Sequence, residues 1–240
     1  MSYAKNDDFC KSEIKIFQKE IERNKIQSVI PPIEFNVSDT KFTQIVKDKI
    51  IPHNPDAVII SGLGKNHGNF LKQLRDNGYQ KPIIIGNGLN FPGIVKYCGQ
   101  QCSDIFVAQA YDYASEKNGN RELKQAYSDL PEKEREGHYP SQFVAQMFTA
   151  IQVTIDTMKK LEENHEERGQ LSLRDINLSD PQQLAALRTA FNAQLRSSNM
   201  SFRTPIGEIQ IDQDGEVHQS DSDIIIIELD SREGQKKITE

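Results

Sequence analysis

Residues 55–89, PDAVIISGLGKNHGNFLKQLRDNGYQKPIIIGNGL, decide the fold of this chain. They contain an apolar run, a glycine-rich loop, a helix-forming segment, a second apolar run and a second glycine turn. This order predicts one βαβ unit whose two loops leave the sheet at the same end. Open parallel sheets bind small molecules there, in the crevice beyond the carboxyl ends of the strands. The stretch therefore indicates a small-molecule site.

The first half of the chain continues this alternation of strands and helices. Its short apolar runs do not alternate with polar residues, which is typical of strands covered on both faces. We therefore expect an α/β fold, an open parallel sheet with helices on both faces. The predicted strands cover 28–35, 57–61, 83–85 and 105–108, and the predicted helices cover 11–24, 42–50 and 69–77.

The second half is mainly helical and ends in strands. A long helix is predicted from Pro140, and a second begins at Pro181 with Asp180 as its N-cap. The first helix carries one apolar stripe that predicts a packing face, made of Val144, Met147, Phe148, Ile151, Ile155 and Met158. The second carries Leu184, Leu187, Phe191 and Leu195. Strands at 207–211 and 224–229, with a hairpin turn at 212–215, close the chain.

Composition excludes several classes of function. The chain has 240 residues and a net charge of −6, with no clustered basic surface, so no nucleic-acid partner is expected. No apolar run approaches the ~20 residues that span a bilayer, and MSYAKNDDFC has no signal-peptide core. Cys10 stands alone, whereas Cys98 and Cys102 are spaced so that a disulfide is open to them in an oxidising compartment.

The sequence does not match the known motifs for dinucleotide binding, metal binding or catalysis. Gly62, Gly64 and Gly68 follow a strand, but His67 stands where the dinucleotide fingerprint needs glycine, and no acid ends the next strand. The glycines still allow close approach to a ligand, and their amides could bind an anionic group. No metal-ligand spacing or nucleophile elbow is present. Adjacent acids such as Asp7-Asp8 and Glu162-Glu163 are interpreted as surface charges. We expect no catalysis, no metal and no cofactor.

Ordered motifs across nearly the whole chain resemble the type 1 periplasmic binding proteins, specifically the Leu/Ile/Val-binding branch that serves ABC transporters and receptors. Residues 3–9, YAKNDDF, resemble its strand-plus-loop Y-x-x-[ND]-D-[YF]. Residues 55–62 resemble its PDAV…G strand, and 78–88 its "G…kPiiigng" continuation. Residues 202–215, FRTPIGEIQIDQDG, resemble its closing hairpin.

The resemblance implies two α/β lobes that close on a ligand, with most of the first lobe missing here. Residues 1–112 would be the second-lobe sheet, and 113–200 a helical return segment that normally packs on the first lobe. Residues 201–240 would be the closing strands of the second lobe and a polar tail. The apolar helix stripes would then lack their sheet, which favours a partner, a homodimer or rearranged packing.

By resemblance, ligand contacts come from loops that follow the strands. They fall at Phe9, Gly62, Leu63, Asn87, Tyr111 and Gln142, although Phe9 could equally be a core residue. The family's amino-acid binders often carry an aromatic residue at the position of Leu63 and an acid near Asn87, which would hold the ligand's ammonium; both are missing here. A neutral Asn pairs poorly with a buried ammonium.

We therefore predict a non-catalytic ligand-binding module for an amino-acid-like molecule or small carboxylate. The family's partners would be an ABC permease or the signalling domains of a longer chain. The resemblance implies an extracytoplasmic location, whereas the opening residues carry no signal peptide, so both a cytoplasmic and an extracytoplasmic location stay open. The alternative is a partial binding-protein domain that serves as an interaction or regulatory module with little ligand affinity.

Overall fold

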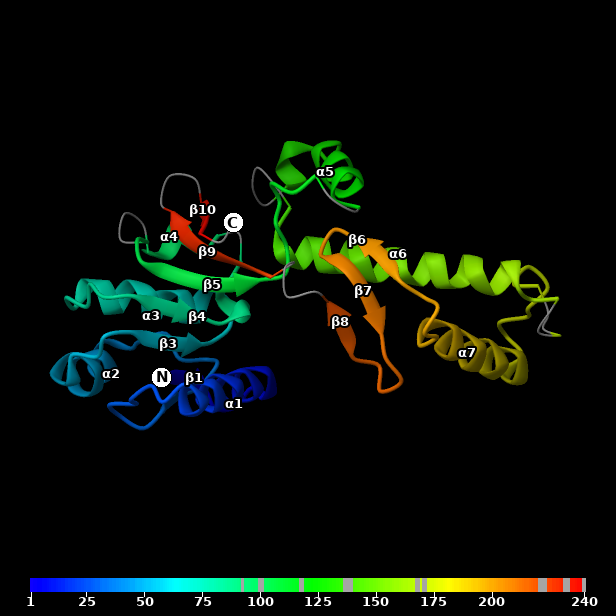
Figure 1. The fold of residues 1–240 in the computed structure, drawn as a ribbon. Coiled ribbons are helices and arrows are strands. Elements are labelled where there is room, and N and C mark those ends of the chain that lie inside the picture. The colour runs from blue at the N-terminus through cyan, green and yellow to red at the C-terminus, as the bar shows by residue number, and fades with distance from the viewer. Residues whose placement is uncertain are drawn as a thin grey trace. The chain divides into compact units, whose positions relative to one another are not determined.

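The computed structural model describes residues 1–91, 93–98, 102–116, 119–135, 140–166, 169, 172–219, 224–230 and 234–238, with the backbone alone at 96, 98, 230 and 234–237. The chain folds as two compact units (Figure 1). The first unit comprises Met1–Gln109 with Ile225–Glu240, and the second comprises Ala110–Ile224.

The first unit is built on a seven-stranded sheet in the order β10-β9-β5-β4-β3-β1-β2. The five neighbouring strands β5, β4, β3, β1 and β2 pair in parallel. Strand β9 pairs with β5 in the antiparallel direction, and β10 pairs with β9 in the same way. The strands are β1 (Ser2–Ala4), β2 (Ile33–Phe35), β3 (Val58–Ser61), β4 (Ile83–Ile85), β5 (Ile105–Gln109), β9 (Ile225–Asp230) and β10 (Gly234–Lys237). The predicted α/β fold with a helix-flanked parallel sheet is confirmed.

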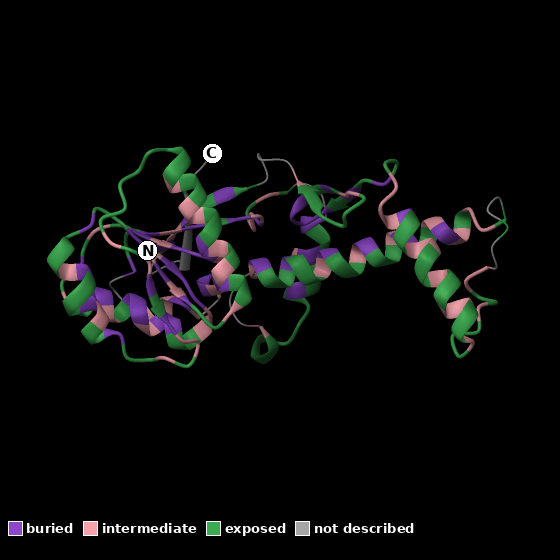
Figure 2. Cartoon of the chain, turned by 90° about the horizontal axis from the view of Figure 1, so that it is seen from below, coloured by how far each residue is buried: buried purple, intermediate pink, exposed green. Residues whose placement is uncertain are grey.

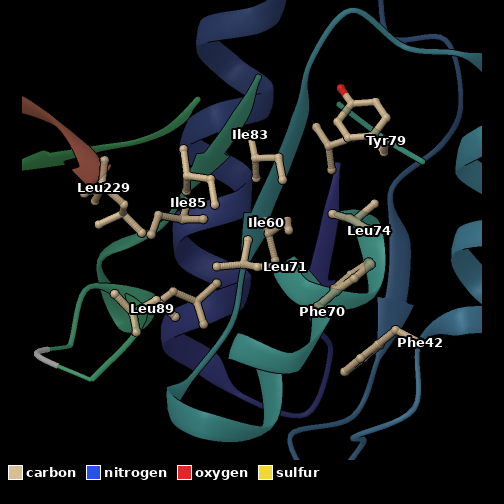
Figure 3. Packing of buried hydrophobic residues seen from close by; sticks show 14 of the residues in the cluster. Phe42, Ile60, Phe70, Leu71, Leu74, Tyr79, Ile83, Ile85, Leu89 and Leu229 are labelled. Atoms are coloured by element: carbon tan, nitrogen blue, oxygen red, sulfur yellow. The ribbon is translucent and has the colours of Figure 1, made fainter. Parts of the chain in front are cut away.

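Helices connect the parallel strands of this unit. They are α1 (Asp8–Arg23), α2 (Thr43–Ile45) continued by the π-helix Val46–Ile50 and the 3-10 helix Ile51–His53, α3 (Gly64–Asp76), the 3-10 helix Asn87–Leu89, and α4 (Val95–Cys98). The chain crosses from β1 to β2 in one direction and from β3 to β4 in the other. Right-handed crossovers therefore place α1 and α3 on opposite faces of the sheet, as Figure 3 shows.

Helix α3 begins five residues before the predicted start at 69. Gly64 and Gly68 are thus helical residues, and the expected glycine-rich loop shrinks to Gly62 and Leu63. A Cβ atom at Gly68 would lie 3.2 Å from the Tyr97 ring and 3.3 Å from Ile94. The glycine is needed for close packing inside a helix, a role that sequence spacing alone does not distinguish from a loop.

The core of this unit lies between the sheet and α3 (Figure 3). Ile60, Ile83 and Ile85 point from the strands toward Leu71 and Leu74 of the helix, and all five are buried. On the opposite face, Ile59, Ile84 and Phe106 are only half-buried. The prediction of strands fully covered on both faces therefore holds for one face only, because α1 contacts β1 and β3 rather than the rest of the sheet.

A buried arginine joins the amino-terminal ends of two strands. Arg75, near the end of α3, is 3% exposed. Its guanidinium donates to the carbonyl oxygens of Tyr79 and Lys81 at 2.8 Å and of Ser103 at 2.7 Å. The planar fork thereby ties together the segments that precede β4 and β5.

The second unit combines helices with a three-stranded antiparallel sheet, ordered β6-β7-β8. Asp180 caps α7 as predicted, since its carboxylate accepts from the backbone N–H of Gln182 at 2.8 Å. The predicted hairpin turn is also present, with Gly215 at φ 87°. The elements are α5 (Asn120–Ser128), the turn Glu132–Glu134, α6 (Gln142–Glu163), α7 (Pro181–Leu195), β6 (Phe202–Thr204), β7 (Gly207–Ile211) and β8 (Val217–Gln219).

Helix α6 buries a different face from the one its apolar pattern marks. The buried residues follow a spacing of four and are mostly small or polar: Ala145, Thr149, Val153, Thr157 and Leu161. The apolar stripe is exposed, with Met147 at 65%, Ile151 at 55% and Ile155 at 47%. Exposed residues accordingly recur along the whole helix in Figure 2. Of the predicted stripe only Phe148 packs against the core of the second unit, and Met158 is half-buried. The prediction of a packing face is therefore wrong for the exposed members.

Residues 201–240, predicted as closing strands of one lobe, divide between the two units. Strands β6 to β8 form their own sheet in the second unit, and β9 and β10 join the seven-stranded sheet. Among the residues that the structure describes, no helix is both long and apolar enough to cross a membrane.

Candidate functional site

Three strand ends meet at the point where the strand order of the sheet reverses. The chain leaves β1 toward β2 on one side, and leaves β3 toward β4 on the other, so the carboxyl ends of β1 and β3 form a topological switch point. The segments that follow are residues 5–9 after β1, Gly62–Leu63 after β3 and residues 86–88 after β4. This edge contains four of the six predicted contact residues.

The structure brings those four positions together. A Cβ atom at Gly88 would lie 2.4 Å from the Gly62 carbonyl oxygen, 2.8 Å from Leu63 Cδ2 and 3.4 Å from Phe9 Cε1. Only glycine allows this approach. Phe9 is 51% exposed, so it is not the core residue that the sequence left open. Leu63 and Asn87 are half-buried beside it.

A buried histidine fixes the loop after β3. The backbone N–H of Leu63 donates to His67 Nδ1 at 2.6 Å, and Nε2 lies 3.2 Å from the carbonyl oxygen of Asn36. Since Nδ1 accepts, Nε2 carries the proton and the ring is neutral. Burial lowers the pKa of His67, opposed by the charges of Asp39 and Asp7. The histidine that broke the dinucleotide fingerprint is thus a structural part of the loop.

A glutamate that sequence reasoning missed reaches the same edge. Glu13, in α1, accepts the backbone N–H of Asn87 on Oε1 at 2.9 Å and the Ser61 hydroxyl on Oε2 at 2.5 Å. Its carboxylate lies over Gly86, where a Cβ atom would be 1.8 Å from Oε2. Glu13 is four residues after Phe9 and so shares its helix face, which is the signal that could have found it.

The two remaining predicted contacts belong to the second unit. Tyr111 is 2% exposed, and its hydroxyl donates to Asn120 Oδ1 at 2.9 Å. Gln142 is 4% exposed, and its Oε1 accepts the backbone N–H of Ala110 at 3.1 Å. Both side chains therefore serve the packing of that unit. Their role in ligand binding stays a prediction.

Metal ligands, cysteines and cavities were the other candidates for a functional site. In the described ranges no group of three His, Cys, Asp or Glu side chains could hold a metal ion. Cys102 is disulfide-bonded and Cys10 is a buried free thiol, while the side chain of Cys98 lies outside the described residues. A cavity of about 340 Å³ lies at the amino ends of the strands, lined by residues such as Ile33 and Val58. That is the end of the sheet opposite the glycine turns.

Comparison with known proteins shows the family of the chain. A family model described as periplasmic binding protein matches residues 2–235. The chain belongs to the periplasmic binding protein family. No curated protein sequence matches it.

Solved structures of similar fold include proteins that are described as binding small molecules. The leucine-binding protein LivK of Thermotoga maritima is 16% identical at a TM-score of 0.73, over 99% of this chain and 58% of its own length. The substrate-binding protein LivJ of the branched-chain amino-acid transporter of Streptococcus pneumoniae was solved in complex with isoleucine. It is 16% identical at a TM-score of 0.70, over 99% of this chain and 58% of its own length. An ABC-transporter solute-binding protein of Rhodopseudomonas palustris was solved in complex with benzoate. It is 16% identical at a TM-score of 0.70, over 99% of this chain and 56% of its own length. This periplasmic binding protein chain thus spans less than two thirds of the length of these structures.

Proposed function

We propose that this chain is a non-catalytic ligand-binding module, and that the edge formed by β1, β3 and β4 is one wall of its ligand site. The observation that carries the proposal is the convergence of Phe9, Leu63 and Gly88 within van der Waals reach at the switch point. Membership of the periplasmic binding protein family supports it. The bound molecule is amino-acid-like or a small carboxylate, as in the isoleucine and benzoate complexes of similar structures.

The mechanism we propose is stabilisation of a closed state. A ligand that contacts this wall and a facing wall binds the closed arrangement better than the open one and shifts the population toward it. The edge formed by β1, β3 and β4 supplies one of these two walls.

Titration of the isotope-labelled chain with amino acids and aromatic carboxylates tests the proposal. We expect the backbone amide signals of Leu63, Asn87 and Gly88 to shift in proton–nitrogen correlation spectra. The variant Gly88→Ala should abolish these shifts, because its Cβ atom forces the two loops apart. Gly93→Ala is the matched control, since its Cβ atom would meet nothing closer than 3.5 Å. Equal binding by both variants would place the ligand elsewhere.

We also propose that the exposed stripe of α6 is an association surface. Met147, Ile151 and Ile155 are about half or more exposed, and a groove of about 690 Å³ runs beside them. Contiguous apolar patches of this kind are typical of interaction sites. The exposed face itself suggests a second copy of the chain, and the family suggests a permease or the signalling domains of a longer chain. Light scattering of Met147→Lys against the unaltered chain tests self-association, which the lysine should weaken.

A further inference from the structure

The edge that we propose as a ligand wall has two loop amides that already have partners. Leu63 N–H donates to His67 Nδ1 and Asn87 N–H donates to Glu13 Oε1. Free amides in glycine loops are the usual protein groups that bind a ligand's carboxylate or phosphate. Because the chain's own acceptors hold these two, they are not available to an anionic ligand group.

The charge at this edge is a carboxylate without a cationic partner. Glu13 is half-buried, and within the described part of the chain no Lys, Arg or His nitrogen lies within the 4.0 Å of an ion pair with it. A partly desolvated carboxylate is costly to leave without a counter-charge. Each carboxylate oxygen has the capacity to accept two hydrogen bonds. The bond from Asn87 occupies one position on Oε1, and the bond from Ser61 occupies one position on Oε2. Each oxygen can therefore accept one more N–H donor.

Apolar groups lie at the same edge of the sheet as this carboxylate. Phe9, one helical turn before Glu13, exposes half of its surface, and Leu63 Cδ2 reaches the same loop. We propose that Glu13 determines ligand charge at this site and selects molecules that carry an ammonium group on an apolar body, against anions such as benzoate. The proposal rests on the function proposed above. It makes the isoleucine-bound structure, rather than the benzoate-bound one, the better guide to this chain's ligand.

Three compounds with the same apolar body separate the charges. Leucine carries both an ammonium and a carboxylate, 3-methylbutylamine carries only the ammonium, and 4-methylpentanoate carries only the carboxylate; benzoate is the fourth probe. Each is titrated into the labelled chain while the amides of Leu63, Asn87 and Gly88 are followed. We expect leucine and the amine to bind, and the two carboxylates to bind at least about tenfold more weakly.

The variant Glu13→Gln keeps an acceptor for Asn87 N–H but removes the charge. It should weaken amine binding roughly tenfold and leave 4-methylpentanoate unchanged or tighter. Glu20→Gln, an exposed acid on the same helix, is the control and should match the unaltered chain. Equal amine affinity in both variants, or binding of the carboxylates alone, would overturn the assignment to Glu13. If no compound shifts these amides, the proposed function itself is wrong and this proposal falls with it.

Discussion

Replacement of Gly86 by alanine should destabilise the chain only while Glu13 is present. Gly86 has φ −75° and ψ 164°, an extended conformation that alanine adopts freely. Its Cβ atom would, however, lie 1.8 Å from Glu13 Oε2, so the carboxylate must swing away. Both of its hydrogen bonds, from Asn87 N–H and from the Ser61 hydroxyl, are then lost.

The magnitude follows from these two bonds. A hydrogen bond to a charged group contributes about 1.5–3 kcal/mol when its partner is buried, as Ser61 is. Asn87 is half-buried, so water recovers part of its bond. Alanine alone would stabilise an extended position by about 0.4–1 kcal/mol through the unfolded chain. Gly86→Ala should therefore lower the free energy of unfolding by roughly 1–4 kcal/mol, and in a Glu13→Ala background it should raise it by ~0.4–1 kcal/mol.

Urea unfolding followed by far-ultraviolet circular dichroism measures the four proteins of this double-mutant cycle. The slope against urea must stay constant for the comparison to report stability. Gly93→Ala serves as the control for a glycine substitution in the same unit, because its Cβ would make only an ordinary contact with Phe91 at 3.5 Å. If Gly86→Ala costs the same with and without Glu13, the carboxylate does not lie over Gly86 and the reasoning is refuted.

Three further predictions concern buried groups. Burial lowers the pKa of His67 below 6.5, so the neutral ring contributes stability above that pH, and this stability is lost as the pH falls. His67→Gln should therefore make the urea midpoint depend less on pH. The same pH dependence in the variant and the unaltered chain would contradict this. Arg75→Lys should cost roughly 2–4 kcal/mol because one ammonium cannot span three carbonyls, whereas exposed Arg23→Lys should cost nothing measurable by the same unfolding assay. Burial raises the pKa of the Cys10 thiol to about 12, so a disulfide reagent should label it only in denaturant, and fast labelling of the native chain would show the burial to be wrong.

The parallel sheet could be predicted because local patterns and tertiary packing agree there. The isoleucine runs of β3 and β4 match their predicted strands within one residue, and Asp180 caps α7 through hydrogen bonds within its own turn. The convergence of Gly62 and Gly88 followed from topology alone, because parallel strands end at one edge. In each case the deciding contacts are either local or imposed by chain direction.

The rest depended on contacts that spacing does not encode. Glu13 acts 74 residues away from Asn87, and its reach depends on how α1 crosses the sheet. His67 looked like a broken motif because its partner Asn36 follows a different strand. In α6 the period of the apolar residues was found, but periodicity shows only that two faces differ. Small residues such as Ala145 permit close packing, so the covered face is the less apolar one.

The pairing of Gln109 with Ile225 has a consequence for how the protein can be dissected. These residues end β5 and begin β9 as direct partners across an antiparallel pair, so the chain leaves the seven-stranded sheet and re-enters it at neighbouring positions. All residues between them could be excised and replaced by a two-residue Asn-Gly turn, which suits such a pair. The resulting miniature would keep Phe9, Leu63 and Glu13 on an unbroken sheet. Ligand recognition by this edge could then be studied on the first unit alone.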